Sequence, residues 1–221
     1  DGITRYGPVS GDPKLKEAIA KKLTEENKIP TNTDQILVTN GGKQAIYNLF
    51  QVILNPGDEV IIPSPYWLSY PAMVNLSGAS PIILETDSED GFKIKPEKLE
   101  ESINNNSKLL IINTPSNPTG QIIQKKELEQ IADLIRKHPN LNVMTDEIYE
   151  YLIENGQEHY SLASIAPDLS DRIFTVNGFA KGWAMTGWRI GYISGNNIVI
   201  KACSALQSQT TSNVCSFAQH G

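Results

Sequence analysis

The 221-residue sequence is poor in the residue types that mark several common protein classes. It has three histidines and only two cysteines, Cys203 and Cys215, and neither set has the spacing of a metal site or a disulfide framework. We therefore expect reduced thiols, a cytoplasmic protein and no bound metal. No apolar run approaches the roughly 18 to 20 residues that a membrane span needs.

Positive charge is also scarce, and several familiar motifs are missing. The formal net charge is −6, from 19 Lys and Arg against 25 Asp and Glu, so the sequence has no basic footprint for nucleic acid or an anionic membrane. It has no P-loop, no GxGxxG after the first strand, no GxSxG and no HExxH. We expect small-molecule partners, with no nucleic acid and no membrane.

Short apolar runs alternate with helical stretches along the whole chain. Seven runs predict strands: 36–38, 60–62, 81–84, 109–112, 141–144, 173–176 and 190–194. Most of them do not alternate with polar residues, which is typical of strands buried on both faces of a parallel sheet. The pattern predicts an α/β fold with a three-layer, doubly wound, mostly parallel sheet, and residues 1–221 are interpreted as one domain.

Two helices are well marked. Asp12 can cap the first, and Pro13 suits its first position. Its apolar face is expected to hold Leu15, Ala18, Ile19 and Leu23. The second spans residues 125–137, with an apolar face of Leu128, Ile131, Ala132 and Ile135.

Ligands of open α/β sheets bind at the carboxyl ends of the strands, so the turns after the predicted strands are candidate site segments. Gly41 and Gly42 follow the first strand and open a helix. Their backbone amides and the helix dipole favour an anion, although a tight strand–helix turn would also explain two glycines. Lys43 favours the anion, because a cation in the first turn of a helix is otherwise unfavourable.

The strongest motif is residues 178–191, Gly-Phe-Ala-Lys-Gly-Trp-Ala-Met-Thr-Gly-Trp-Arg-Ile-Gly. It resembles the lysine-attachment signature of class I/II (fold type I) pyridoxal-phosphate-dependent aminotransferases, and the likeness is closest to prokaryotic-type aspartate aminotransferases. The resemblance implies the large, cofactor-binding domain of fold type I. It also implies that Lys181 forms a Schiff base with pyridoxal 5′-phosphate and later moves the substrate's α-proton. Arg189, eight positions later, is implied to bind the cofactor phosphate.

Other turns resemble the same family in order and spacing. Asp146 in Thr-Asp-Glu-Ile-Tyr is implied to pair with the pyridine nitrogen, and Asn117 in Ser-Asn-Pro-Thr-Gly and Tyr149 to donate to the ring oxygen. Trp67 in Pro-Tyr-Trp-Leu-Ser-Tyr is implied to stack on the ring. Gly41, Gly42 and Lys43 complete the cofactor set, and Lys43, Trp67 and Asn117 are also expected to contact substrate. Singly, each has an ordinary alternative as a turn, cap or core residue.

Two further features follow from the resemblance. Tyr6 is implied to reach the cofactor phosphate of a partner subunit, which predicts a homodimer with a shared active site; a turn-flanking aromatic is the alternative. Gly178 departs from the pattern, because other branches of the family carry a serine there for the phosphate. We therefore expect one phosphate contact to be missing or replaced.

The resemblance predicts amino-group transfer between an amino acid and a 2-oxo acid, with L-aspartate and 2-oxoglutarate first because of Lys43. A prephenate aminotransferase, a β-lyase or decarboxylase on the same scaffold, and a non-catalytic sensor domain remain alternatives. Family members are much longer, and neither the N-terminal segment that closes over substrate nor the C-terminal small domain has a counterpart here. The chain does not begin with Met, which suggests a fragment or a processed chain. We expect the 221 residues alone to bind cofactor but to be inactive.

Overall fold

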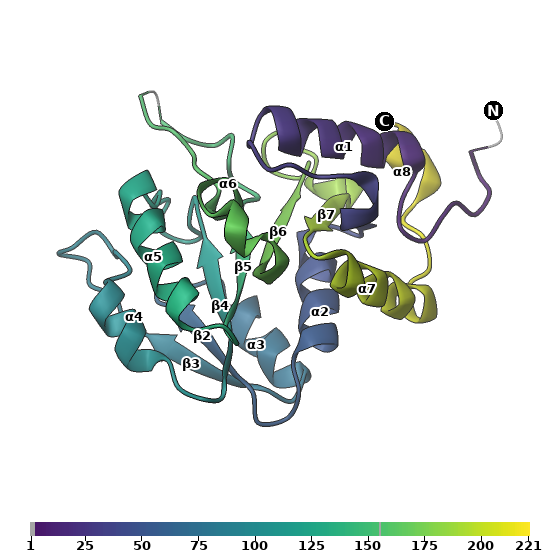
Figure 1. Ribbon diagram of the computed structural model, residues 1–221. Helices are drawn as coiled ribbons and strands as arrows, with labels where there is room; N and C mark the ends of the chain where they lie inside the picture. Colours follow the sequence, from purple (N-terminus) through teal and green to yellow (C-terminus); the bar gives the residue numbers. More distant parts are fainter. Residues whose placement is uncertain (1–2, 155) are drawn as a thin grey trace.

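The computed structural model describes residues 3–154 and 156–221, built around one seven-stranded sheet (Figure 1). Asp1, Gly2 and Asn155 lie outside the described residues, so the predicted 1–221 domain is described without them. The strands are β1 (Ile36–Thr39), β2 (Glu59–Pro63), β3 (Ser80–Leu84), β4 (Ser107–Asn113), β5 (Asn142–Asp146), β6 (Ile173–Gly178) and β7 (Gly191–Ser194). Each of the seven predicted strands is confirmed.

The sheet is mostly parallel, as expected. Its order is β1-β7-β6-β5-β4-β2-β3, and only β7 pairs antiparallel with both of its neighbours. The other pairs, from β6 through β5, β4 and β2 to β3, are parallel. The reversal at β7 has a local cause, because only a short 3-10 helix (Thr186–Trp188) separates it from β6. A parallel return needs a longer crossover.

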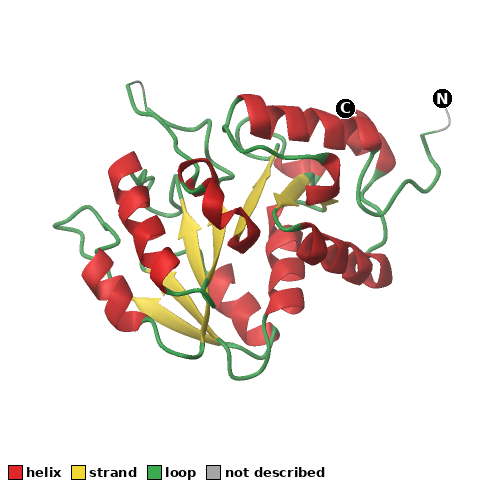
Figure 2. Cartoon of the chain, viewed as in Figure 1, coloured by secondary structure: helices red, strands yellow, loops and turns green. Residues whose placement is uncertain are grey.

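Helices cover both faces of the sheet (Figure 2). They are α1 (Pro13–Glu25), α2 (Gly42–Ile53), α3 (Ser69–Leu76), α4 (Pro96–Ser102), α5 (Lys125–Lys137), α6 (Leu162–Ile165), α7 (Asn197–Thr210) and α8 (Ser216–His220). Two more 3-10 helices span Thr33–Gln35 and Pro167–Arg172. None of the described helices combines the length and the apolar composition that crossing a bilayer requires.

The alternation of side chains along β4 shows why the fold has three layers. Leu109 and Ile111 point into the core shared with α2, α3 and α7. Leu110 and Ile112 point into the opposite core, shared with α4, α5 and α6. A strand whose successive residues are all apolar can fill both cores, because successive side chains project to opposite faces. The predicted three-layer architecture is therefore confirmed.

The two predicted helices form, with one correction. The four expected residues of α5 are fully buried, and Asp12 caps α1 by accepting from the amides of Lys14 and Leu15. Ala18, predicted on the buried face of α1, is exposed, and Ala20 is buried instead. Successive residues of a helix turn by about 100°. The buried stripe centres between Ile19 and Leu23, which brings Ala20 closer to it than Ala18.

Candidate active site

Strand ends meet at one edge of the sheet and place polar side chains there. Asn113, Asp146 and Gly178 are the last residues of β4, β5 and β6, and Gly191 opens the antiparallel β7 at the same edge. A cavity of about 270 Å³ lies at this edge. It is lined by Gly42, Lys43, Ile46, Trp67, Tyr70, Asn113, Asn117, Asp146, Ile148, Tyr149, Ala180, Lys181 and Arg189. The structure thus brings together eight of the ten predicted site residues, from five separate segments.

Gly41, the ninth predicted residue, lies directly beside the cavity, against the guanidinium of Arg189. Its φ of 83° suits glycine, and its carbonyl accepts from the amides of Gln44 and Ala45 as α2 begins. The first amides of a helix have no partner inside the helix, so the amides of Gly42 and Lys43 point toward an incoming ligand. This geometry supports the anion-binding interpretation of the glycine pair.

Arg189 adds a positive charge at the same place. Its guanidinium donates to the carbonyls of Asn40, at 3.2 Å, and Thr186, at 3.0 Å. A Cβ at Gly41 would lie 2.5 Å from that guanidinium, so only glycine lets the arginine approach the helix N-terminus this closely. The backbone of Arg189 is left-handed, with a φ of 56°, a strained conformation of the kind that clusters at functional sites. No carboxylate neutralises Arg189 within the described part of the chain.

Gly178 has a packing reason that the sequence did not reveal. It pairs with Gly191 between β6 and β7. A Cβ at Gly178 would lie 2.8 Å from the Cα of Gly191 and 2.9 Å from the carbonyl oxygen of Ile190. A serine at position 178 would therefore clash, which explains why glycine stands there; the expected loss or replacement of a phosphate contact stays a prediction.

Asp146 supplies a buried carboxylate at the floor of the cavity. It is 5% exposed and accepts a hydrogen bond of 2.7 Å from the hydroxyl of Tyr70. Burial raises the pKa of Asp146 from 3.8 to about 6, and the bond from Tyr70 opposes part of that rise. Burial and the adjacent carboxylate also raise the pKa of Tyr70 well above its ordinary value. Across the residues that the structure describes, no lysine, arginine or histidine forms an ion pair with Asp146. The carboxylate thus offers an acceptor to a cationic ligand.

The stability of the ligand-free protein should report this carboxyl group. Because the folded-state pKa is raised, the protonated form stabilises the fold below about pH 4, and this contribution is lost as the pH rises through about 6. A shift of about two units corresponds to roughly 3 kcal/mol. Between pH 4 and pH 7, the unfolding free energy of the wild type should fall by about that amount relative to Asp146→Asn. Urea titrations at each pH measure the difference; parallel curves would contradict the assignment.

Asn117 and Tyr149 lie on the other side of the cavity. The Asn117 side-chain amide lies 3.4 Å from the Tyr149 hydroxyl, and the Asn117 backbone amide donates to the Asn113 side chain at 2.7 Å. Asn113 in turn donates to the carbonyl of Asp146 at 2.9 Å. A chain of hydrogen bonds therefore fixes the predicted donors relative to the buried carboxylate.

The two lysines flank the cavity against aromatic rings. The Nζ of Lys181 lies 5.7 Å from the centre of the Tyr149 ring, and the Nζ of Lys43 lies 4.8 Å from the centre of the Trp67 ring. Trp67 itself packs edge-to-face against Tyr70, with ring centres 5.4 Å apart. Both ammonium groups are thus held toward the space that the other site residues surround.

Tyr6 is the one predicted site residue that lies away from this cavity. Its side chain is 91% exposed, and it lines a separate open depression with Arg5, Ser216 and Phe217. It does not complete the site of its own chain. Its reach into a partner subunit stays a prediction.

Sequence reasoning missed two polar residues of the site, Tyr70 and Asn113. Tyr70 lies three positions after Trp67 in α3, and Asn113 is the last residue of β4. Asn113 could have been found, because a polar residue that ends a buried strand falls at the ligand-binding edge. Nothing in the sequence pairs Tyr70 with Asp146, which is 76 residues away.

Comparisons with known proteins identify the family of the chain. The model of the family described as aminotransferase class I and II matches residues 1–221, and the chain belongs to this family. A probable aspartate/prephenate aminotransferase of Rickettsia bellii is 54% identical over 219 residues, which cover 99% of this chain and 55% of that protein. The bifunctional aspartate aminotransferase and glutamate/aspartate-prephenate aminotransferase of Petunia hybrida is 49% identical over 99% of this chain and 46% of its own length.

Solved structures show the same fold. The aspartate aminotransferase from Thermus thermophilus with maleate superposes with a TM-score of 0.94 at 46% identity. The match covers 99% of this chain and 56% of that one. The chain spans about half the length of the curated relatives it matches.

Proposed function

We propose that this protein transfers an amino group between an amino acid and a 2-oxo acid, using pyridoxal 5′-phosphate held covalently by Lys181. The observation that carries the proposal is that one cavity contains both a buried carboxylate and a lysine side chain. Asp146 is a buried carboxylate without a cationic partner in the described chain, and Lys181 faces the same space. The Asp146 carboxylate would pair with a cationic ring nitrogen, and the Lys181 amine would condense with a carbonyl group.

The remaining residues suit the other parts of that cofactor. Its phosphate suits the amides at the start of α2 and the guanidinium of Arg189, which Gly41 admits to the same corner. Asn117 and Tyr149 offer donors to the ring oxygen, and Trp67 offers a ring face. The bound cofactor supplies an electron sink for the pair left on the substrate's α-carbon. Lys181, once its amine is free, holds and moves the proton of that carbon.

Aspartate is the proposed substrate because of Lys43. Its ammonium group is exposed at the cavity wall and lies against Trp67, where a second carboxylate of a substrate could reach it. The Thermus thermophilus structure of the same fold was solved with maleate, a dicarboxylate. We therefore propose L-aspartate and 2-oxoglutarate as donor and acceptor. Prephenate is the second candidate acceptor, because several relatives are named aspartate/prephenate aminotransferases.

The full-length protein should be assayed with aspartate and glutamate as donors and with 2-oxoglutarate and prephenate as acceptors. Formation of the matching 2-oxo and amino acids supports the proposal. Release of a thiol, ammonia and pyruvate from a cysteine S-conjugate, without any acceptor, would instead identify a lyase.

Replacing Lys43 by alanine should separate substrate choice from chemistry. Loss of the ammonium group removes an ion pair to the distal carboxylate, so kcat/KM for aspartate should fall by about 100-fold. The value for alanine, which has no distal carboxylate, should change by less than about threefold. Steady-state kinetics with both donors measure the ratio. An unchanged aspartate preference would remove the role of Lys43.

Assembly and location follow the same proposal. A homodimer would let Tyr6, which is exposed here, complete the site of its partner. The cytoplasmic location and the shared active site stay predictions, and the oligomeric state can be measured by light scattering on the full-length protein.

A further inference from the structure

A second polar cluster lies behind the cavity, and its centre is Glu150. This carboxylate is 7% exposed and does not line the cavity. Three donors from three parts of the chain surround it. Lys22 of α1 forms an ion pair with it, Asn27 donates to it at 2.6 Å, and Asn177 of β6 donates to it at 2.8 Å.

The cluster joins the two segments that carry the reacting groups. Glu150 directly follows Tyr149, whose hydroxyl faces the cavity. Asn177 accepts from the amide of Gly178 at 2.7 Å, and Gly178 begins the loop that leads to Lys181. The Glu150 carboxylate therefore connects the turn that contains Tyr149 to the start of the loop that contains Lys181.

Helix α1 holds this junction from outside. The Nζ of Lys22 also lies 5.3 Å from the centre of the Tyr151 ring, and the Tyr151 hydroxyl donates to Glu26 at 2.6 Å. Tyr151 packs in turn on Trp183, just beyond the lysine, with ring centres 4.8 Å apart. Figure 1 shows α1 crossing over the ends of β6 and β7. An ion pair, Lys22 with Glu150, thus holds α1 to the junction, and an aromatic contact, Tyr151 with Trp183, joins the two segments.

A metal ion is a weaker explanation of the same cluster. Glu147, Glu150 and His159 place ligand atoms within 4.8 Å of one another. The carboxylates already have donors, however. Ser161 donates to Glu147 at 2.8 Å, His159 lies 3.2 Å from it, and the ammonium group of Lys22 supplies the positive charge at Glu150. A divalent ion would have to displace this cation.

We infer that Glu150 is a positioning residue that sets the Tyr149 hydroxyl relative to the Lys181 amine. Glu150 belongs to the Tyr149 segment, and its Oε1 accepts from Asn177 at the start of the lysine segment. The carboxylate therefore holds the two segments at a set distance while staying outside the reaction space. The role in catalysis rests on the proposed function; the mechanical link rests on the contacts alone. Small displacements of positioned groups cost up to about 100-fold in rate, so a link of this kind has a measurable effect.

The first test is hydrogen exchange of the ligand-free, full-length protein. Glu150→Gln should speed exchange about 10-fold in both segments, residues 147–152 and 178–183, because neither keeps its anchor. Lys21→Met is the matched control, because Lys21 neighbours Lys22 on α1 but forms only an exposed pair with Glu25. The control should leave both segments unchanged. Faster exchange in residues 147–152 alone would overturn the link.

A double variant separates positioning from stability. Replacing a buried ion pair by apolar residues often restores stability. Lys22→Met/Glu150→Leu should therefore recover the thermal midpoint that Glu150→Leu loses, yet leucine cannot accept from Asn177. The affinity of the double variant for pyridoxal phosphate should stay about 10-fold below that of the wild type. Recovery of affinity together with stability would show a purely structural role.

The last arm tests whether Glu150 acts through Tyr149. The affinity loss of Glu150→Gln should shrink from about 10-fold to under about twofold in a Tyr149→Phe background, because the hydroxyl to be positioned is gone. If Glu150→Gln lowers the affinity by the same factor in the Tyr149→Phe background as in the wild type, the inference is overturned. If the wild type binds no pyridoxal phosphate, the proposed function fails. Hydrogen exchange of the two segments then still decides the link, with coupled acceleration supporting it.

Discussion

Replacing Lys181 by alanine is expected to abolish covalent attachment of pyridoxal phosphate and to lower turnover by at least about 10⁴-fold. One side chain is lost in two roles: the amine that holds the cofactor and the base that moves the substrate's α-proton. The surrounding donors stay in place, so reversible cofactor binding should persist. Absorbance spectra, borohydride reduction followed by mass spectrometry, and steady-state kinetics measure the three effects.

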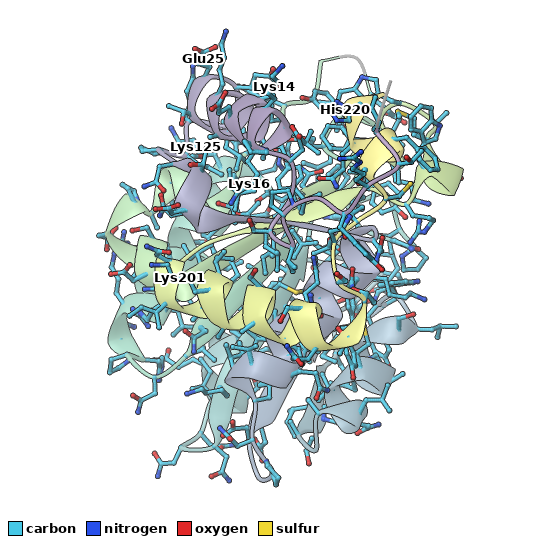
Figure 3. The ribbon with its side chains drawn as sticks, turned by 90° about the vertical axis from the view of Figure 1, so that its right-hand side faces the viewer. Lys14, Lys16, Glu25, Lys125, Lys201 and His220 are labelled. Carbon is cyan, nitrogen blue, oxygen red and sulfur yellow. The ribbon has the colours of Figure 1, made fainter. Side chains whose placement is uncertain are left out.

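Lys201→Ala is the control for this variant. Lys201 is an exposed lysine on α7, labelled in Figure 3, and it does not line the cavity. The Lys201→Ala variant should keep both the covalent attachment of the cofactor and the wild-type turnover. Cofactor that remains covalently bound to Lys181→Ala would show that another amine carries it.

The second large effect is expected for Asp146→Asn, which should lower kcat by about 10³-fold. The asparagine keeps the size of the side chain and can still accept from Tyr70, so the substitution removes little besides the charge. A fixed charge at a water-poor site contributes about this much to transition-state stabilisation. Without it, the protein no longer favours the protonated form of the ring nitrogen. Steady-state kinetics with saturating cofactor measure the loss.

Asp168→Asn is the matched control, because Asp168 is an exposed carboxylate paired with Arg136 on the surface. Its variant should keep full activity. The proposed role of Asp146 would be wrong if both variants kept the wild-type kcat.

Local signals in the sequence accounted for most of the fold. The seven apolar runs became the seven strands because a run without alternation suits only a strand buried on both faces. The sequence placed the start of α1 and both ends of α5 to the residue. The antiparallel direction of β7 could not be predicted, because it depends on how a short connection returns to the sheet. Ala18 was misplaced for a similar reason, since the partner surface decides where a buried stripe is centred.

The candidate site divides in the same way. The sequence by itself determined the residues with distinctive local motifs: Lys181 and Arg189 in one segment, and Gly41 and Gly42 at a helix start. Only the tertiary structure decided which side chains bond to the buried carboxylates of this region. Tyr70 reaches Asp146 across 76 residues, and Lys22 reaches Glu150 across 128.

The physical reason lies in how each kind of interaction is formed. A motif is a property of neighbours along the chain, whereas a buried carboxylate needs donors from whichever elements pack around it. Asp146 and Glu150 lie four residues apart, yet one faces the cavity without a cationic partner in the described chain and the other is paired behind it. That difference, from which we propose a ligand contact for Asp146 and a positioning role for Glu150, was set by packing.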